Sequence, residues 1–157
     1  MKINEFRSAV LIEKGWSGDR KYCVTDDKGI KYLLRITDES TFDQKRTEFE
    51  YMQKTAALGV SMCMPVEFGR CSEGVYVLHS WIDGQDLRDV IDSMTDSEAY
   101  EHGFYAGEML EKIHSIPAPE WVEDWQSRFD RKIDRKLKLY SECELKYANG
   151  GAFIEFI

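Results

Sequence analysis

The stretch VLIEKGWSGDRKYCVTDDKGIKYLLRIT, residues 10–37, decides the fold of this chain. It contains three apolar runs rich in branched and aromatic residues, at positions 10–12, 22–24 and 30–37, as strands do. A small-residue loop at 15–18 separates the first two runs, and a four-residue turn ending in Gly29 separates the second and third. The stretch therefore predicts three short strands joined by glycine-containing turns.

The third run contains a single cation, Arg35, between Leu34 and Ile36. A charge inside an apolar strand is costly unless it meets a partner or a ligand. Glycines let backbone N–H groups approach phosphate oxygens, and the Ser17 hydroxyl in the preceding loop adds another donor. The pattern suits a nucleotide triphosphate, with Arg35 reaching the phosphates as the strand lysine of protein kinases does. The alternative is an ordinary β-meander with Arg35 on a solvated face.

Length and composition restrict the possible classes of protein. A chain of 157 residues can bury a core and is most simply one domain or two small lobes. Its net charge of −8 argues against a general nucleic-acid binder. The sequence predicts no membrane span and no signal peptide, and its four cysteines lack a C-x-x-C spacing. We therefore expect reduced thiols and a cytoplasmic location.

Helical periodicity replaces the strand pattern after residue 37. Ser40 is the expected N-cap of a helix that runs to Leu58 and ends at Gly59. At about 100° per residue, Glu48 lies about 40° from Met52 on the apolar stripe of this helix. Glu48 is thus directed towards the sheet, where we expect it to pair with Arg35; the alternative is a solvated carboxylate at the edge of the stripe.

Two further strands and several helices follow in the sequence. Strands are expected at 65–70 and 75–81, and the strand pattern stops in the segment Ile82-Asp83-Gly84. Thr95 and Glu98 predict a capping box that opens a helix to about Ser115. Amphipathic helices are expected at 121–140 and from residue 152 onward.

The order of these segments resembles that of the aminoglycoside phosphotransferases, a group with a kinase-like fold that also takes in choline kinases and macrolide phosphotransferases. The resemblance spans residues 10–141, and its most specific parts are WIDGQDL after the fifth strand and LEKIHSI at the end of the long helix. It implies ATP and Mg²⁺ as cofactors and a small-molecule hydroxyl, such as that of an aminoglycoside-type antibiotic, as acceptor.

The resemblance also implies roles for individual residues. Arg35 would replace the phosphate-binding lysine, and Glu48 would be the helix glutamate. The remaining implied residues form the nucleotide-positioning loop, Gly15, Trp16, Ser17, Gly18 and Asp19, and the adenine-binding hinge, Ser80, Trp81 and Ile82. Arginine departs from the family lysine because a guanidinium is a planar fork and an ammonium is a point charge. The family's His-Gly-Asp catalytic loop and later metal-binding aspartate do not occur in the sequence, so no catalytic or metal-binding residue is assigned.

We therefore expect an α+β fold: a kinase-like N-lobe at 1–82 with a five-stranded antiparallel sheet and one helix, a hinge and linker helix at 83–94, and the first helices of an incomplete C-lobe at 95–157. The chain would be the ATP-binding part of a longer phosphotransferase, inactive by itself. Apolar residues of the C-terminal helices would then be exposed and favour self-association. Two alternatives are a nucleotide-binding pseudokinase or regulatory module, and a small-ligand sensory domain. The sensory domain would have an enclosed apolar cavity in the concave face of the sheet and no contact between Arg35 and Glu48.

Overall fold

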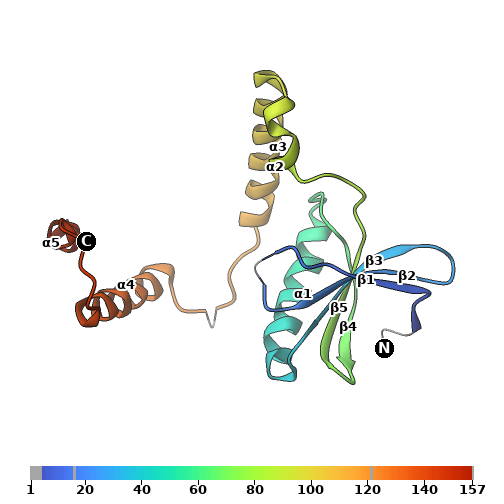
Figure 1. Ribbon diagram of the computed structural model, residues 1–157, viewed down its shortest axis with the longest axis horizontal. Coiled ribbons are helices and arrows are strands. Elements are labelled where there is room, and N and C mark those ends of the chain that lie inside the picture. Colours follow the sequence, from blue (N-terminus) through green and yellow to red (C-terminus); the bar gives the residue numbers. More distant parts are fainter. Residues whose placement is uncertain (1–4, 16, 121, 157) are drawn as a thin grey trace. The chain divides into compact units, whose positions relative to one another are not determined.

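The computed structural model describes residues 5–15, 17–120 and 122–156. The chain forms two compact units, Met1–Ile116 and Pro117–Ile157. The division at residues 82 and 94 stays a prediction. The elements, in chain order, are β1 (Ser8–Leu11), β2 (Arg20–Thr25), β3 (Lys31–Thr37), η2 (Glu39–Thr41), α1 (Phe42–Ala57), β4 (Pro65–Cys71), β5 (Gly74–Ser80), α2 (Leu87–Val90), η3 (Ile91–Ser93), α3 (Asp96–His114), α4 (Trp125–Glu142) and α5 (Gly150–Phe156) (Figure 1).

The five strands form one antiparallel sheet in the order β1-β2-β3-β5-β4. The prediction of an α+β fold with a five-stranded antiparallel sheet is confirmed. Arg35 on β3 is directly opposite Lys21 on β2 and Val77 on β5, whereas Leu34 is opposite Tyr22 and Leu78. Because successive side chains of a strand point to opposite faces, Arg35 and Leu34 lie on different faces of the sheet.

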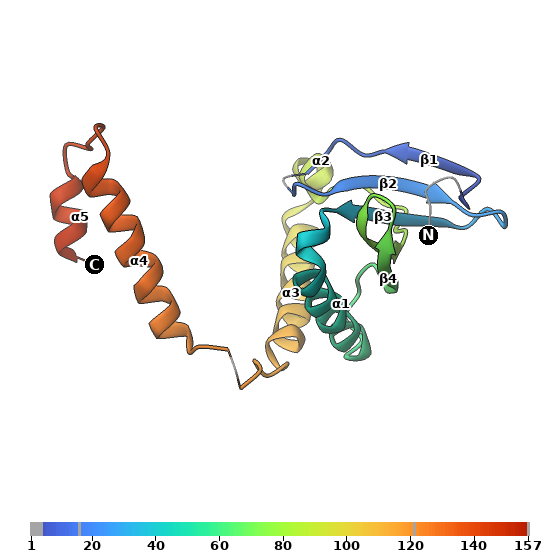
Figure 2. The same ribbon diagram turned by 90° about the horizontal axis from the view of Figure 1, so that it is seen from below.

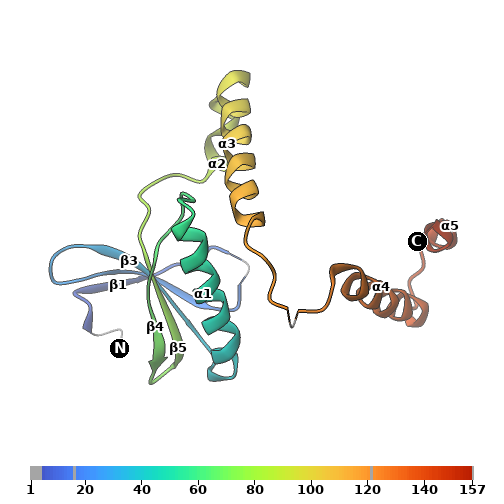
Figure 3. The same ribbon diagram turned by 180° about the vertical axis from the view of Figure 1, so that it is seen from behind.

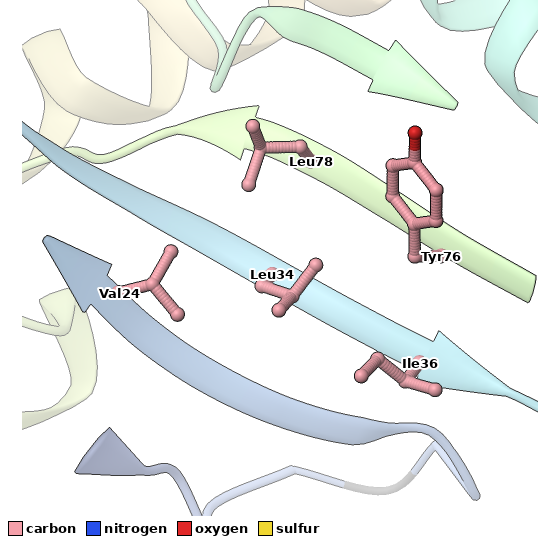
Figure 4. Close-up of a cluster of buried hydrophobic side chains, with 5 residues drawn as sticks. All are labelled: Val24, Leu34, Ile36, Tyr76 and Leu78. Carbon is pink, nitrogen blue, oxygen red and sulfur yellow. The ribbon is translucent and has the colours of Figure 1, made fainter. Parts of the chain in front are cut away.

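The face that carries Leu34 holds the main hydrophobic cluster. This cluster consists of five buried side chains from β2, β3 and β5, which Figure 4 shows on neighbouring strands: Val24, Leu34, Ile36, Tyr76 and Leu78. The side chain of Phe6, which precedes β1, packs against them. The N-terminal segment thereby helps to shield this face from water.

The face that carries Arg35 is covered by α1, which contacts β4 and β5 and lies on one side of the sheet in two further views of the molecule (Figures 2 and 3). Two aromatic rings of the helix, Phe42 and Phe49, lie 5.1 and 5.7 Å from the ring of Phe68 on β4. β5 is consequently buried on both faces over residues 75–79.

The start of α1 differs from the sequence prediction. Ser40 lies in the 3₁₀ turn η2, which Asp38 caps: the Asp38 carboxylate accepts hydrogen bonds from the backbone N–H of Ser40 at 2.9 Å and from the Ser40 hydroxyl at 2.6 Å. The helix α1 begins after this turn, at Phe42, and the preceding residue Thr41 makes no side-chain cap hydrogen bond. The predicted end is confirmed, because Gly59 follows the helix with φ of +71°.

The predicted capping box of α3 is confirmed, since Thr95 and Glu98 satisfy each other's backbone N–H groups. In the second unit, α4 begins at Trp125 because the Asp124 carboxylate caps it through the Ser127 N–H at 3.0 Å. The predicted first residue of this helix, Trp121, lies outside the described residues. Among the helices described, none is both long enough and apolar enough to cross a membrane.

Gly74 opens β5 in a conformation that other residues rarely adopt, with φ of +123°. A Cβ at this position would lie 2.1 Å from the backbone oxygen of Thr37, so even a methyl group cannot be accommodated without a backbone shift. Gly29 provides a matched comparison, because its φ is +83° and a Cβ there would meet nothing within 4 Å.

We therefore expect Gly29→Ala to lower the free energy of unfolding by about 1–2 kcal/mol, the cost of a left-handed conformation. Gly74→Ala should lower it by a further 1–3 kcal/mol or so, because steric overlap adds to the backbone strain. Urea denaturation of the two variants measures both losses, and equal losses would contradict the close approach of β5 to Thr37.

Candidate functional site

Arg35 forms an ion pair with Asp19, a residue of the loop before β2. Its guanidinium donates two hydrogen bonds to one carboxylate oxygen of Asp19, Oδ2, from Nε at 2.9 Å and from Nη2 at 2.5 Å. The Asp19 side chain is only 8% exposed and that of Arg35 33% exposed. This ion pair compensates the charge that the sequence places inside an apolar strand.

The predicted ion pair between Arg35 and Glu48 does not form; this prediction was wrong. Lys45, one helical turn before Glu48, donates to the Glu48 carboxylate at 3.0 Å and approaches Asp19 Oδ2 at 3.4 Å. The ammonium of Lys45 therefore links the two carboxylates. Glu48 is nonetheless on the predicted side of α1, because it lines the same cavity as Arg35.

Lys45 is the principal residue that sequence reasoning missed. Its position three residues before Glu48 was the available signal, because residues three apart share a helix face. Burial raises the pKa of the Glu48 carboxyl, but hydrogen bonds from Lys45 and Gln44 and the charges of Lys45 and Arg35 outweigh that effect and hold its pKa below the usual value. Glu48 is thus kept ionised.

A small cavity of about 30 Å³ lies between α1 and the sheet, with charged and apolar side chains in its wall: Arg35, Lys45, Glu48, Phe49, Met52, Val77 and His79. His79 is 3% exposed, and its Nδ1 has no hydrogen-bond partner among the described residues. Burial, and next the charges of Arg35 and Lys45, lower the pKa of the imidazole. His79 is therefore held neutral beside two cations.

Lys21, directly opposite Arg35 on the same face, was also missed. Its ammonium donates to the backbone oxygen of Lys14 at 2.8 Å. Gly15 makes room for this contact, since a Cβ there would lie 2.6 Å from the Lys21 nitrogen. Lys14 in turn forms an exposed ion pair with Asp86. These contacts connect the glycine loop to the segment that follows β5.

The predicted hinge lines a pocket, although one of its three residues is already engaged. The Ser80 N–H donates to the Met64 oxygen at 2.9 Å, and the Ser80 hydroxyl accepts from the Met64 N–H at 2.8 Å. Trp81 and Ile82 line an open pocket of about 630 Å³, together with Lys14, Gly84, Gln85, Asp86, Asp89 and Val90. This volume is in the range of small-molecule sites.

The other loop residues are less constrained. A Cβ at Gly18 would meet nothing within 4 Å, and Ser17 is exposed. Trp16 lies outside the described residues. Within the described part of the chain, no three His, Cys, Asp or Glu side chains are placed to hold a metal ion. The carboxylates of Asp19 and Glu48 are occupied by cations, so the described residues do not form a Mg²⁺ site.

The fold and the cation-bearing strand define the N-lobe of a kinase-like protein. Residues 8–153 match the model of the phosphotransferase enzyme family, APH, and the chain belongs to that family. The resemblance seen in the sequence is thereby confirmed, and the class of chemistry is phosphoryl transfer. A search of curated proteins found no significant match to the chain.

The buried His79 predicts a pH dependence of stability. Because its pKa is lower in the folded than in the unfolded state, the unfolded state binds the additional proton as the pH falls below about 6.5. The free energy of unfolding should therefore decrease from that pH downward until the folded-state pKa is passed. His79→Gln should remove this part of the slope in urea denaturation at several pH values.

His114, which is exposed near the end of α3, provides the control. His114→Gln should leave the pH dependence of the wild type in place. If His79→Gln retains the wild-type slope between pH 7 and 5, His79 is not held neutral in the folded chain.

Proposed function

We propose that the chain is the ATP-binding part of a phosphotransferase that moves the γ-phosphoryl group of ATP to a hydroxyl of a small molecule. The observation that carries this proposal is the convergence of Arg35 and Lys45 on Asp19, at the end of the glycine loop. Two cations held by a strand and a helix beside a glycine loop suit the phosphates of a nucleotide.

The pocket lined by Trp81 and Ile82 supports the same proposal at the base end of the nucleotide. In the described part of the chain, Ile82 makes no backbone hydrogen bond, so its backbone groups are available to a base edge. Ser80 contributes less than predicted, because its N–H and hydroxyl already bind Met64. Lys14 lines this pocket, and its backbone oxygen accepts a hydrogen bond from Lys21. This hydrogen bond connects the pocket with the face of the sheet that carries Arg35.

The acceptor remains a proposal at the level of a small-molecule hydroxyl, with aminoglycoside-type antibiotics as its first candidates. No His-Gly-Asp segment occurs in the 157 residues, and the described residues offer no metal site, so we propose that the chain binds ATP without transferring its phosphate. A pseudokinase or regulatory module would share the nucleotide site. The sensory-domain alternative predicted an apolar cavity in the sheet and no contact between Arg35 and Glu48. The cavity described there is small and has charged as well as apolar side chains in its wall, which speaks against this alternative, whereas the missing Arg35–Glu48 ion pair agrees with it.

Two further expectations stay predictions. Self-association through the C-terminal helices agrees with the exposure of apolar side chains there, among them Leu110, Phe129, Phe153 and Ile154. The cytoplasmic location agrees with the four free cysteines.

Nucleotide binding is tested by titration calorimetry of the chain with ATP. Arg35→Ala should weaken binding by about 1.5–3 kcal/mol, the range for a hydrogen bond to a charged group, which is roughly ten- to 150-fold in Kd. Arg35→Lys should retain most of the affinity, because a single cation is preserved. Trp81 emission should change during the titration.

Arg20→Ala is the matched control, because Arg20 is opposite Ile36 and so lies on the other face of the sheet, where it pairs with Glu73. Its Kd should equal that of the wild type. Equal ATP affinity of the wild type and Arg35→Ala would refute the assignment of Arg35 to the phosphates.

A further inference from the structure

The ion pairs among Arg35, Asp19, Lys45 and Glu48 form a cluster on the face of the sheet that α1 covers. This cluster suggests which group occupies the phosphate site in the absence of a nucleotide. We propose that Lys45 is a second phosphate-binding residue, and that the Asp19 carboxylate occupies the position that a phosphate oxygen takes in the nucleotide complex. This inference rests on the proposed function, and it adds a residue and a competition that the family resemblance does not contain.

The first argument is the geometry at a single oxygen. Asp19 Oδ2 accepts from Arg35 Nε at 2.9 Å and Nη2 at 2.5 Å, and Lys45 Nζ lies 3.4 Å away. Donors from a strand and from a helix therefore converge on one anionic oxygen. Carboxylate and phosphate oxygens are both strong acceptors for such charged donors, so a phosphate oxygen can replace this carboxylate oxygen.

The second argument is burial. The side chains of Asp19 and Lys45 are 8% and 14% exposed, so the carboxylate covers the Lys45 ammonium, whereas the Arg35 side chain is 33% exposed and remains partly open to water. A phosphate can reach Arg35 and Lys45 together only after Asp19 leaves. Without Asp19, the cluster keeps two cations, Arg35 and Lys45, and one carboxylate, Glu48. The net charge of the cluster is then positive, which favours an anionic ligand.

His79 provides an independent observation. Its Nδ1 is buried without a partner among the described residues, in the wall of the cavity formed by Arg35, Lys45 and Glu48. Buried polar atoms are rarely left unpaired, and each case calls for an explanation. The unpaired Nδ1 shows that a hydrogen-bonding position beside the two cations is left unused, in a cavity of about 30 Å³, which has room for a single small group.

The elements that hold the residues differ in a way that permits the exchange. Arg35 and Lys45 are fixed within β3 and α1, whereas Asp19 precedes the first residue of β2. Asp19 follows Gly18, and the space beside Gly18 is open, because a Cβ added there would meet no atom within 4 Å. Its side chain can therefore leave the cations without breaking a strand pair.

The experiment is titration calorimetry of the full chain with ATP, with inorganic tripolyphosphate and with adenosine. Lys45→Met should weaken binding of both polyphosphates by about tenfold, and Asp19→Asn should strengthen it by about tenfold, because the competing carboxylate is removed. Adenosine affinity should not change in either variant, since it has no phosphate.

Arg46→Met is the control for Lys45, because Arg46 is the next residue of α1 and forms an exposed pair with Asp43; it should bind like the wild type. Wild-type affinity of Lys45→Met for ATP, or weaker binding by Asp19→Asn, would overturn the inference while leaving the proposed function intact if Arg35→Ala still weakens binding. Absence of ATP binding by the wild-type chain would overturn both. If Asp19→Asn does not fold, Lys45→Met alone decides.

Discussion

The charge of Arg35 is the constraint on which the rest of this structure depends. A guanidinium in the middle of an apolar strand requires an anion nearby, and Asp19 supplies it from the glycine loop. The same pair fixes the end of that loop against the face of the sheet that α1 covers. Lys45 and Glu48 extend the pair into a network of two cations and two carboxylates, in which Asp19 and Lys45 are the members shielded from water.

The alternation of side chains along the strands places the hydrophobic cluster on one face of the sheet and the charged side chains of the candidate site on the other. Leu34 and Ile36 face the hydrophobic cluster, whereas Arg35 between them faces α1. β5 supplies both faces, with Tyr76 and Leu78 in the cluster and Val77 and His79 in the wall of the charged cavity. A stable apolar layer can thus support a charged site on its other side, in the N-lobe of a kinase-like fold.

Sequence patterns predicted the five strands, α1, the capping box of Thr95 and the helix face of Glu48, because each depends on local periodicity or on residues a few positions apart. They did not predict which carboxylate pairs with Arg35. That choice depends on where the loop residue Asp19 lies in space, because two carboxylates, Asp19 and Glu48, compete for one guanidinium and sequence spacing does not rank them. Lys45 then pairs with Glu48. The cap at Asp38 was missed for a related reason, since Ser40 and Asp38 are both good caps and the backbone geometry selects one.

The most direct measurement is a crystal structure of the chain with a non-hydrolysable ATP analogue. The account predicts a phosphate oxygen within hydrogen-bonding distance of both the Arg35 guanidinium and the Lys45 ammonium, with the Asp19 carboxylate moved away from both. An analogue bound with its phosphates elsewhere, while Asp19 still pairs with Arg35, would contradict it.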